Sequence, residues 1–583
     1  MKVKLSSFLK PYRLFVILAP LMMALEVFMD LLQPAFMATV VNDGILGGNM
    51  EVILQTSLKM FGAALIGMAG GFGCTIFATI SAMNYGADLR GALFRKTGEF
   101  SFSEIDSFST GSLVTRLTND VTQLQNLVAI ALRMFVRSPL LCFGGIFMAL
   151  SISFRYGFIL LVSIPILFLI IALVYKKITP LFSAMQKKLD RLNAILQENL
   201  AGVRVIKAFV RGEHEKRRFN EANDDLTNTS LAAMRIIAIV QPVMMIVMNA
   251  VVIAVIYIGG FQIQALEMRV GDVMAGISYM TQILMSFMML GMAFAMISRA
   301  KVSAGRVREV LETDASIKDG PINEEIKRGE IVFEDVFFSY AGGSGDPVLK
   351  NLSLRIEAGE HVGILGSTGA GKSSLVGLIS RFYDTTGGRV LVDGIDVRDY
   401  TLSSLRSQIG VVLQEAVLFS GSIAENIAWG KTDAGDDELK AAAQAAQADD
   451  FISAMDEGYD SVLSQGGLTL SGGQKQRTSI ARALVKKPKI LIMDDSTSAL
   501  DLGTERRLND AIAASYTQGT RVTIAQRISS VMNTDRIYVM NDGEIAAAGT
   551  HDELLRGSEI YRDIFESQMG KGMLPEFNPQ GAS

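Results

Sequence analysis

The chain has 583 residues, of which 49% are hydrophobic, and its formal net charge is −4. This length exceeds a single core, so more than one domain is expected, and a mean hydropathy of +0.32 indicates that part of the chain lies in lipid. The balanced charge, with no long basic run, argues against a nucleic-acid partner, and the two cysteines fall in apolar stretches that favour buried free thiols over a disulfide.

Six apolar runs in the first half of the chain are long enough to cross a bilayer. They predict an all-α transmembrane domain. The first run is too long for a signal peptide and lacks a small-residue cleavage site, so we interpret it as a retained span. The runs centre on 14–41, 58–82, 128–152, 156–175, 237–261 and 273–297.

Lysine and arginine concentrate before the first span, between the second and third, between the fourth and fifth, and after the sixth. The positive-inside rule places these segments in the cytoplasm, and with them the N-terminus and the C-terminal half of a multi-pass cell-membrane protein. The intervening loops carry only Arg155 and Arg269. The connections 84–127 and 176–235 are charged and mostly free of proline, which predicts helices that continue below the bilayer.

Two of the predicted spans carry residues that could form a binding site. Glu26 and Asp30 lie at i, i+4 and therefore share one face of the first helix. Ionisable groups at that depth usually face a cavity or a partner, so the pair is either a substrate site for cationic amphiphiles, a gate, or a buried polar contact. Methionines on the sixth span suit either an adaptable cavity or ordinary packing. They are Met274, Met280, Met285, Met288, Met289, Met292 and Met296.

The pattern changes after the sixth span. An amphipathic helix leads to a polar stretch containing Asp-Gly-Pro, and from Ile331 short apolar strands alternate with helical stretches and glycine turns. This pattern indicates an α/β domain. The predicted organisation is a transmembrane domain at 1–312, a linker at 313–330, an α/β P-loop nucleotide-binding domain at 331–569 and a disordered tail at 570–583.

The segment GSTGAGKS lies between an apolar strand at 362–365 and a helical run at 375–379, the setting of a phosphate-binding P-loop. Its glycines let backbone amides face the phosphates of ATP, Lys372 neutralises phosphate charge, and Ser373 is expected to ligate Mg²⁺. A buried strand, 490–493, delivers Asp494 to the magnesium shell. The candidate ATP-binding residues are Gly366, Ser367, Thr368, Gly369, Ala370, Gly371, Lys372, Ser373 and Ser374.

The sequence LSGGQKQR at 470–477 resembles the signature of the ATP-binding cassette (ABC) transporters. The resemblance extends over nearly the whole chain, and specifically to exporter half-transporters with the membrane domain first. The resemblance implies that Tyr340 stacks on adenine, that Gln414 is the Q-loop residue and a magnesium ligand, and that Ser498 to Asp501 form the D-loop. The stretches 109–121 and 198–209 resemble exporter sequences near the two coupling helices.

The resemblance also implies a dimer of cassettes, in which each ATP lies between the P-loop of one subunit and the signature of the other. Signature residues Ser471, Gly472, Gly473 and Gln474 would then contact the ATP held by a partner.

Two positions depart from the pattern of fast family members. Asp495 stands where they have Glu, and Gln526 stands where they have the switch histidine, while His214, His361 and His551 lie elsewhere. The shorter carboxylate withdraws a general base from the attacking water, and Gln can donate an N–H but carries no positive charge. Asp495, Gln526 and Gln414 are therefore expected to form a slow catalytic site, unless Asp495 acts through an intervening water. A further departure is Gln465, where exporters commonly have Glu.

The signature shows no such change. We therefore predict a heterodimeric exporter of amphipathic drugs or lipids, driven by alternating access, in which this chain holds the slow site and the partner has intact Glu and His. Alternatives are a homodimeric transporter with low ATPase activity, an importer on the same scaffold, and a nucleotide-gated regulator or channel. A soluble ABC-type ATPase acting on DNA or ribosomes is a further alternative, which the six spans disfavour.

Overall fold

The computed structural model describes residues 3–340, 346–467 and 469–570, and the predicted tail lies outside this range except for Gly570. The chain divides into two compact units. Unit 1 comprises Met1–Gly98 and Gly111–Thr313, and unit 2 comprises Glu99–Thr110 and Asp314–Ser583. The short segment from Glu99 to Thr110 thus belongs with the C-terminal unit, although it is flanked on both sides by unit 1. The predicted domain limits remain a prediction.

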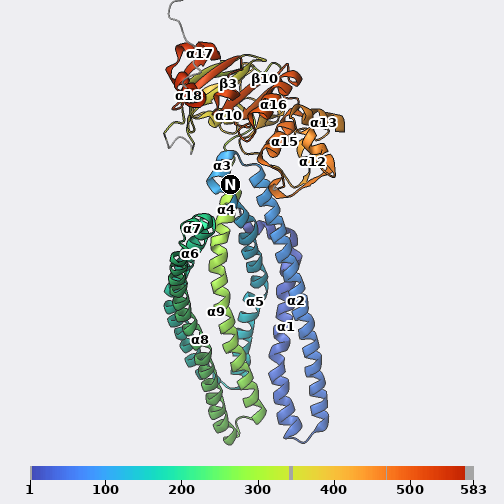
Figure 1. The fold of residues 1–583 in the computed structure, drawn as a ribbon. Coiled ribbons are helices and arrows are strands. Elements are labelled where there is room, and N and C mark those ends of the chain that lie inside the picture. The colour runs from blue at the N-terminus through green and yellow to red at the C-terminus, as the bar shows by residue number, and fades with distance from the viewer. Residues whose placement is uncertain (1–2, 341–345, 468, 571–583) are drawn as a thin grey trace, which may run out of the picture. The chain divides into compact units, whose positions relative to one another are not determined.

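Unit 1 is all-helical, and its long helices run side by side as a bundle (Figure 1). Within the described residues, five helical stretches are long and apolar enough to cross a membrane: Leu5–Ile45, Met50–Gly98, Thr110–Ile152, Tyr156–Ala201 and Gly212–Gln264. The sixth predicted span falls in α9, where the side chains of residues 290–295 and 298 are not described, and it remains a prediction as a span. The long helices are α1 (Arg13–Thr39), α2 (Met50–Gly98), α5 (Val121–Ile152), α6 (Tyr156–Ala201), α8 (Gly212–Gln264) and α9 (Val270–Glu312). The shorter ones are η1 (Leu5–Tyr12), η2 (Val40–Ile45), α4 (Thr110–Thr115), η3 (Arg116–Asp120) and α7 (Val203–Ala208).

Small residues let α1 and α2 approach closely. The buried face of α2 includes Ala63, Gly67, Gly70, Cys74 and Ala78 at intervals of three or four residues. A Cβ added at Gly70 would lie 2.8 Å from the carbonyl oxygen of Met22 on α1, so only glycine fits there. Close backbone approach of this kind supplies the packing that holds helices together where water does not drive them together. Cys74 is buried and Cys142 is half-buried, and both are free thiols.

Helices α6 and α8 pack against each other through a small cluster of Leu192, Ile195 and Ala222. The short helix α7 connects them and has no buried residue. After it, Phe209 and Val210 are exposed to 73% and 88%, and Val210 has a left-handed φ of 52°. Apolar side chains are therefore exposed at the end of the helix pair where α7 connects α6 to α8.

Unit 2 is α/β and contains two main sheets. An antiparallel sheet has the order β2-β1-β4-β5, from β1 (Ile331–Phe338), β2 (Leu349–Ile356), β4 (Gly387–Val392) and β5 (Ile395–Asp396). A six-stranded sheet has the order β12-β11-β3-β10-β9-β6, from β3 (His361–Gly366), β6 (Ile409–Val412), β9 (Ile490–Asp494), β10 (Thr520–Ala525), β11 (Arg536–Asn541) and β12 (Glu544–Gly549). Strands β7 (Gly421–Ser422) and β8 (Val462–Leu463) form a small pair. The predicted α/β fold after the transmembrane helices is thereby confirmed.

Helices accompany both sheets (Figure 1). They are α3 (Phe102–Phe108), α10 (Lys372–Ile379), α11 (Leu402–Ser407), α12 (Ile423–Ala428), α13 (Asp436–Ala445), α14 (Asp449–Ser453), α15 (Gly472–Leu484), α16 (Leu502–Ser515), α17 (His551–Gly557) and α18 (Glu559–Met569), with single-turn helices at Gly458–Asp460, Gln465–Gly467 and Ile528–Ser530.

The central strands of the six-stranded sheet set the position of the site. Strand β10 runs parallel to both β3 and β9, with Ala525 opposite Leu365 and Ile524 opposite Asp494. Every residue of β9 is buried, as a strand covered on both faces requires. Because the three strands are parallel, their carboxyl ends lie at one edge of the sheet, where open α/β sheets bind ligands.

Candidate nucleotide site and membrane cavity

The P-loop connects the end of β3 at Gly366 to the start of α10 at Lys372. Gly369 and Gly371 have left-handed φ angles of 88° and 94°, which glycine adopts without steric cost. A Cβ added at Gly366 would lie 2.5 Å from the carbonyl oxygen of Met540. The glycines are thus needed for the loop conformation, which presents the positive N-terminal end of α10.

Lys372 is buried at the base of this loop. Its ammonium donates to the carbonyl oxygens of Gly366 and Ser367, at 2.8 and 2.7 Å. Burial lowers the pKa of Lys372, and the carboxylates of Asp495 and Asp494 oppose that shift. An ammonium has three donors, so two bonds to carbonyls leave one donor for an anionic ligand.

Asp494 ends strand β9 and is buried. Burial raises the pKa of its carboxyl, while a hydrogen bond from Ser373 and the charge of Lys372 act in the opposite direction. A serine hydroxyl beside a carboxylate supplies the hard oxygen donors that magnesium prefers. The residues present therefore fit the metal that the sequence predicts.

Asp495 adopts a left-handed backbone conformation with φ of 46°, which turns the chain immediately after the strand. Its Oδ2 accepts a hydrogen bond from the side-chain amide of Gln526 at 3.3 Å and a longer one from that of Gln414 at 3.5 Å. The hydroxyl of Thr368 in the P-loop donates to the amide oxygen, Oε1, of Gln526 at 3.4 Å. Burial, and then the neighbouring Asp494, raise the pKa of the Asp495 carboxyl. The two sequence departures thus lie in contact with each other.

These residues line one cavity of about 270 Å³ within unit 2. The three predicted catalytic residues and the predicted metal ligands all face it. Tyr340, whose hydroxyl lies 2.8 Å from the Ser374 hydroxyl oxygen, is 43% exposed at the same cavity. The described residues that line it are Tyr340, Val348, Thr368, Gly369, Gly371, Lys372, Ser373, Ser374, Gln414, Asp494, Asp495 and Gln526.

The signature residues are built separately. Ser471 caps α15: its hydroxyl accepts from the backbone N–H of Gln474 at 3.3 Å, and the Gln474 side chain accepts from the Ser471 N–H at 2.9 Å. Ser471 and Gly472 are exposed, and none of Ser471, Gly472, Gly473 and Gln474 is among the described residues that line the P-loop cavity. The side chain of Gln465 lies outside the described residues.

The D-loop joins β9 to α16. Ser498 donates to the carbonyl oxygen of Asp495 at 2.9 Å, and Asp501 caps α16 by accepting from the Thr504 N–H at 2.9 Å. Asp495, which turns the chain after β9, therefore also holds the start of the D-loop through its carbonyl oxygen.

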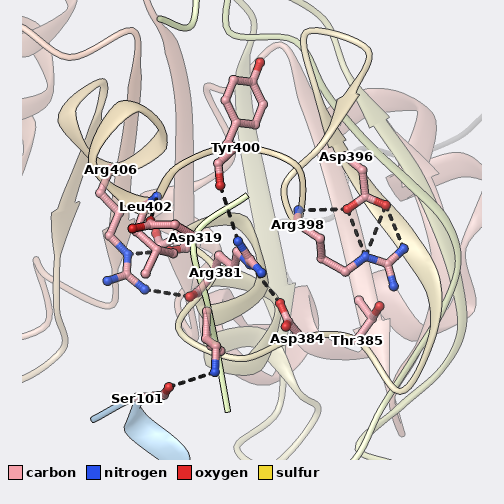
Figure 2. A network of polar contacts seen from close by, with 12 residues as sticks. Ser101, Asp319, Arg381, Asp384, Thr385, Asp396, Arg398, Tyr400, Leu402 and Arg406 are labelled. Atoms are coloured by element: carbon pink, nitrogen blue, oxygen red, sulfur yellow. Dashed lines mark hydrogen bonds and ion pairs between the residues drawn. The ribbon is translucent and has the colours of Figure 1, made fainter. Parts of the chain in front are cut away.

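A polar network fixes the segment that follows α10 (Figure 2). Arg381 has a left-handed φ of 49° and donates to Asp384 at 3.0 Å and to the carbonyl oxygen of Tyr400 at 3.4 Å. Arg406 in turn donates to the carbonyl oxygen of Arg381 at 2.7 Å. Guanidinium groups with several donors each thus tie the end of the P-loop helix to α11.

The same part of unit 2 includes the segment from Glu99 to Thr110. Ser101, which is labelled in Figure 2, accepts a hydrogen bond from the backbone N–H of Ile317 at 3.1 Å. Phe102 packs on Phe382 with ring centroids 4.5 Å apart, and Tyr383 donates to Asp106 at 2.8 Å. The segment that follows α10 therefore contacts α3 through an aromatic pair and a hydrogen bond.

Unit 1 holds a second cavity, of about 1030 Å³, between α1, α2, α5 and α9. Glu26 and Asp30 line it, and both form ion pairs with Arg137 of α5, the second at 3.0 Å. The two carboxylates are thus part of a polar contact within the bundle and also face a cavity, and their role remains a prediction. Its described lining residues are Met23, Glu26, Asp30, Gln33, Ala64, Gly67, Met68, Gly71, Phe72, Thr75, Ala129, Ile130, Arg133, Met134, Arg137 and Met289.

Two residues of this cavity, Arg133 and Arg137, did not emerge from the sequence reasoning. Both fall inside the predicted third span, at i, i+4. That spacing equals the spacing of Glu26 and Asp30, so it is a signal that could have predicted the pairing.

The methionines of α9 do not form one surface. Met280 is buried and packs in the bundle core with Met288, whereas Met289 lines the cavity and Met274 and Met285 are exposed. The side chain of Met292 lies outside the described residues. Ordinary packing thus accounts for at least two of them.

Comparison with known proteins agrees with this geometry. Residues 16–287 match the family model described as the ABC transporter transmembrane region, and residues 349–498 match the model described as ABC transporter. A chain that joins membrane-spanning helices to such a nucleotide-binding domain is an ATPase-coupled transmembrane transporter. ABC exporters work as dimers in the membrane, so a single chain of this kind provides half of the functional transporter.

Relatives extend over the whole chain. YfiB of Bacillus subtilis, described as an uncharacterized ABC transporter ATP-binding protein, is 42% identical over 569 residues, covering 97% of this chain and 99% of the relative. Rv1273c of Mycobacterium tuberculosis, with the same description, is 36% identical over 574 residues and 97% of each chain. A fatty acid ABC transporter ATP-binding/permease protein of Mycobacterium bovis is 35% identical over 466 residues, covering 80% of this chain and 74% of the relative. The chain therefore belongs to the ABC transporter family.

A solved structure of a bacterial Atm1-family ABC exporter with ATP bound superimposes with a TM-score of 0.76 at 27% identity, covering 95% of this chain and 98% of that chain. The predicted resemblance and the predicted fold class are confirmed: a helical transmembrane domain followed by an ATP-binding cassette, in the exporter arrangement.

Proposed function

We propose that this chain is one subunit of a heterodimeric ABC exporter, and that it contributes a slow ATP site together with an intact signature for the site of its partner. The observation that carries the proposal is the Asp495 carboxylate, which accepts hydrogen bonds from the amides of Gln526 and Gln414. None of the three histidines is among the described residues that line the cavity.

The geometry supports slow hydrolysis for two reasons. A general base must lie within hydrogen-bond reach of the attacking water, and an aspartate reaches about one carbon–carbon bond less far than a glutamate. Gln526 donates an N–H but brings no positive charge toward the charge that develops on the phosphate. Both changes lower catalysis more than they lower binding.

Nucleotide binding itself is supported by the P-loop. The proposed contacts are the backbone amides from Gly366 to Ser374 for the phosphates, the free donor of Lys372 for their charge, and Tyr340 for the base. Ser373, Gln414 and Asp494 would hold Mg²⁺. When bound, the metal neutralises phosphate charge and orients the terminal phosphate.

The signature supports the asymmetric pairing. Ser471 and Gly472 are exposed at the N-terminus of α15 and are not among the described residues that line the P-loop cavity of the same chain. An undamaged signature beside an impaired catalytic residue is useful when the signature completes a competent site on another subunit. The exposed Phe209 and Val210 beyond α7 are also consistent with a partner surface.

The proposed transport cycle is alternating access of the membrane unit, driven by ATP-dependent closure of the cassettes. The proposed cargo is an amphipathic drug or lipid, in keeping with a relative that is described as a fatty acid transporter. We place the chain in the cell membrane with the N-terminus and the cassette in the cytoplasm, and with domain limits at 1–312, 313–330 and 331–569. Two alternatives are a homodimer with low ATPase activity and a nucleotide-gated regulator.

Purification of the chain from its native membrane in mild detergent tests the proposal, with mass spectrometry of the subunits that co-purify. A stoichiometric second half-transporter that has Glu and His at the two positions is the expected result. Recovery of this chain alone as a dimer would favour the homodimer. ATP-dependent export by the purified complex in proteoliposomes then separates a transporter from a nucleotide-gated regulator.

A further inference from the structure

We propose that Arg133 binds the acidic head group of an amphiphilic ligand in the unit 1 cavity, so that the cargo carries a carboxylate or phosphate and an apolar tail. This inference rests on the proposed function and specifies its substrate class. It differs from the cationic amphiphile that Glu26 and Asp30 suggest when the sequence is considered alone.

The pairing of charges in the cavity leaves Arg133 without a carboxylate partner among the described residues. Glu26 and Asp30 are both paired with Arg137, which lies on α5. The structure records no hydrogen bond or ion pair between Arg133 and any of the described residues, although its side chain lines the same cavity. The two carboxylates and two guanidiniums that line the cavity sum to zero formal charge. Both carboxylates contact Arg137, so Arg133 is the charged group of the described lining that has no hydrogen bond or ion pair and can offer its donors to a ligand.

The place of Arg133 makes this charge significant. It lies one helical turn before Arg137, on the same face of α5 and inside the predicted third span. An ionised group within a membrane segment is costly and typically marks a substrate path or a pairing site. A guanidinium is always charged and offers a planar set of donors that matches a carboxylate or a phosphate in two parallel hydrogen bonds.

The remaining walls suit an apolar tail. Met23, Met68, Phe72, Ile130, Met134 and Met289 line the cavity around the charged residues. Methionine adapts its shape to different apolar groups, and ligand sites commonly combine apolar walls with a few polar groups that fix orientation. The cavity thus offers a cationic contact for a head group and an adaptable surface for a chain.

The carboxylate of Glu26 lies against Gly71 of α2. A Cβ added at Gly71 of α2 would lie 2.8 Å from Oε2 of Glu26. The carboxylate therefore fits at this position because residue 71 is a glycine. Glu26 sits in this space and pairs with Arg137. This arrangement keeps the nearest carboxylates engaged.

Direct binding of radiolabelled oleate tests the proposal. The full-length chain, with any subunit that co-purifies, is placed in phosphatidylcholine nanodiscs without nucleotide. Arg133→Gln is expected to weaken oleate binding by about tenfold or more, because a charge-assisted hydrogen bond is lost, and Arg133→Lys should recover part of the affinity. Arg155→Gln is the matched control, since Arg155 is exposed and pairs with Glu267 outside the cavity. It should bind oleate as the unmodified protein does.

Competitors with the same tail identify the head group. Oleyl phosphate and oleate should both displace the label, and whichever displaces it at the lower concentration is the preferred head group. Oleylamine should displace it poorly because Arg133 repels a cation. Equal competition by oleylamine, or equal oleate binding by the Arg133→Gln and Arg155→Gln variants, would overturn the proposal.

A loss of oleate binding can be distinguished from a loss of folding. Arg133→Gln removes a charge that has no partner among the described residues, so its melting temperature should match that of Arg155→Gln, and Arg133→Met offers a second variant that keeps the apolar stem. The binding measurement needs neither hydrolysis nor an identified partner. A failure here therefore leaves ATP-dependent transport by the complex intact, and a failure of transport leaves the binding result readable.

Discussion

The two cavities of this chain are built in different ways. In unit 2, the nucleotide cavity is formed by the ends of parallel strands and by a glycine-rich loop, so backbone groups and a few short side chains define it. In unit 1, the membrane cavity is formed by long side chains from four helices, and its charges come from α1 and α5.

This difference decides how each cavity can vary. A backbone cradle requires glycines at fixed positions, and a substitution there disturbs every phosphate contact at once. A cavity lined by side chains can change its ligand through one substitution, because the helices keep their packing. The nucleotide site is therefore expected to have a fixed ligand, and the membrane cavity to have a ligand that depends on its charged residues.

The largest effect is expected from Arg137→Gln. It leaves the partly exposed Glu26 and Asp30 without their shared cation, and loss of a hydrogen bond between charged groups typically costs about 1.5–3 kcal/mol. The variant should unfold at a clearly lower temperature in detergent. Adding Glu26→Gln and Asp30→Asn should restore the melting temperature, whereas Arg155→Gln should leave it unchanged. A stable single variant would mean that the pair is not structurally important.

The next effect concerns the unit 2 cavity. Lys372→Ala removes the buried ammonium that faces the phosphates, and loss of a charged hydrogen-bond donor typically lowers affinity by about 10- to 100-fold. Binding of a fluorescent ATP analogue to the purified chain measures the change. Lys350→Ala is the control, because Lys350 pairs with Asp542 outside the cavity. Equal affinity for the two variants would exclude a phosphate contact by Lys372.

A smaller effect, of opposite sign, is expected from Asp495→Glu. The longer side chain restores reach to the attacking water, and a well-placed general base can raise the rate by about tenfold or more. The ATPase rate of the complex is the measurement, with the partner's own site inactivated. Gln526→His in the same protein should raise the rate further. An unchanged rate in both variants would show that reach and charge do not limit hydrolysis.

The smallest effect is a pH dependence of the residual ATPase activity. A general base acts as the carboxylate, and burial raises the pKa of Asp495, with Asp494 acting in the same direction. Protonation therefore begins at a higher pH than for an ordinary aspartate, and the rate should fall as the pH decreases through that raised pKa. A pH–rate profile measures this, and Asp495→Asn should remove the acid limb. A profile with no acid limb would argue that Asp495 is not the base.

Much of unit 2 could be predicted from the sequence. The glycine spacing of the P-loop, the apolar run that ends at Asp494 and the order of the later motifs are local patterns, and each requires particular residues at particular backbone positions. The order of motifs also predicted that Asp494, Asp495, Gln414 and Gln526 belong to one site. What it could not predict is that Gln414 and Gln526 donate to the same oxygen of Asp495.

Unit 1 was predictable only in part. Hydropathy predicts the helices and their order because the bilayer imposes a length on each span. It does not say which faces meet, since lipid-facing and packed residues are both apolar. Glu26 and Asp30 therefore stood without partners in the sequence, and the carboxylates alone suggested a cationic ligand.

Residue order along the chain is enough to predict the two-part architecture, the P-loop and the changes at Asp495 and Gln526. The folded chain was needed to see that Arg137 pairs with both acidic residues and that Arg133 has no partner among the described residues. Charge pairing depends on helix contacts between residues far apart in the chain. In lipid, hydropathy does not predict which helix faces meet, and side-chain packing determines those contacts.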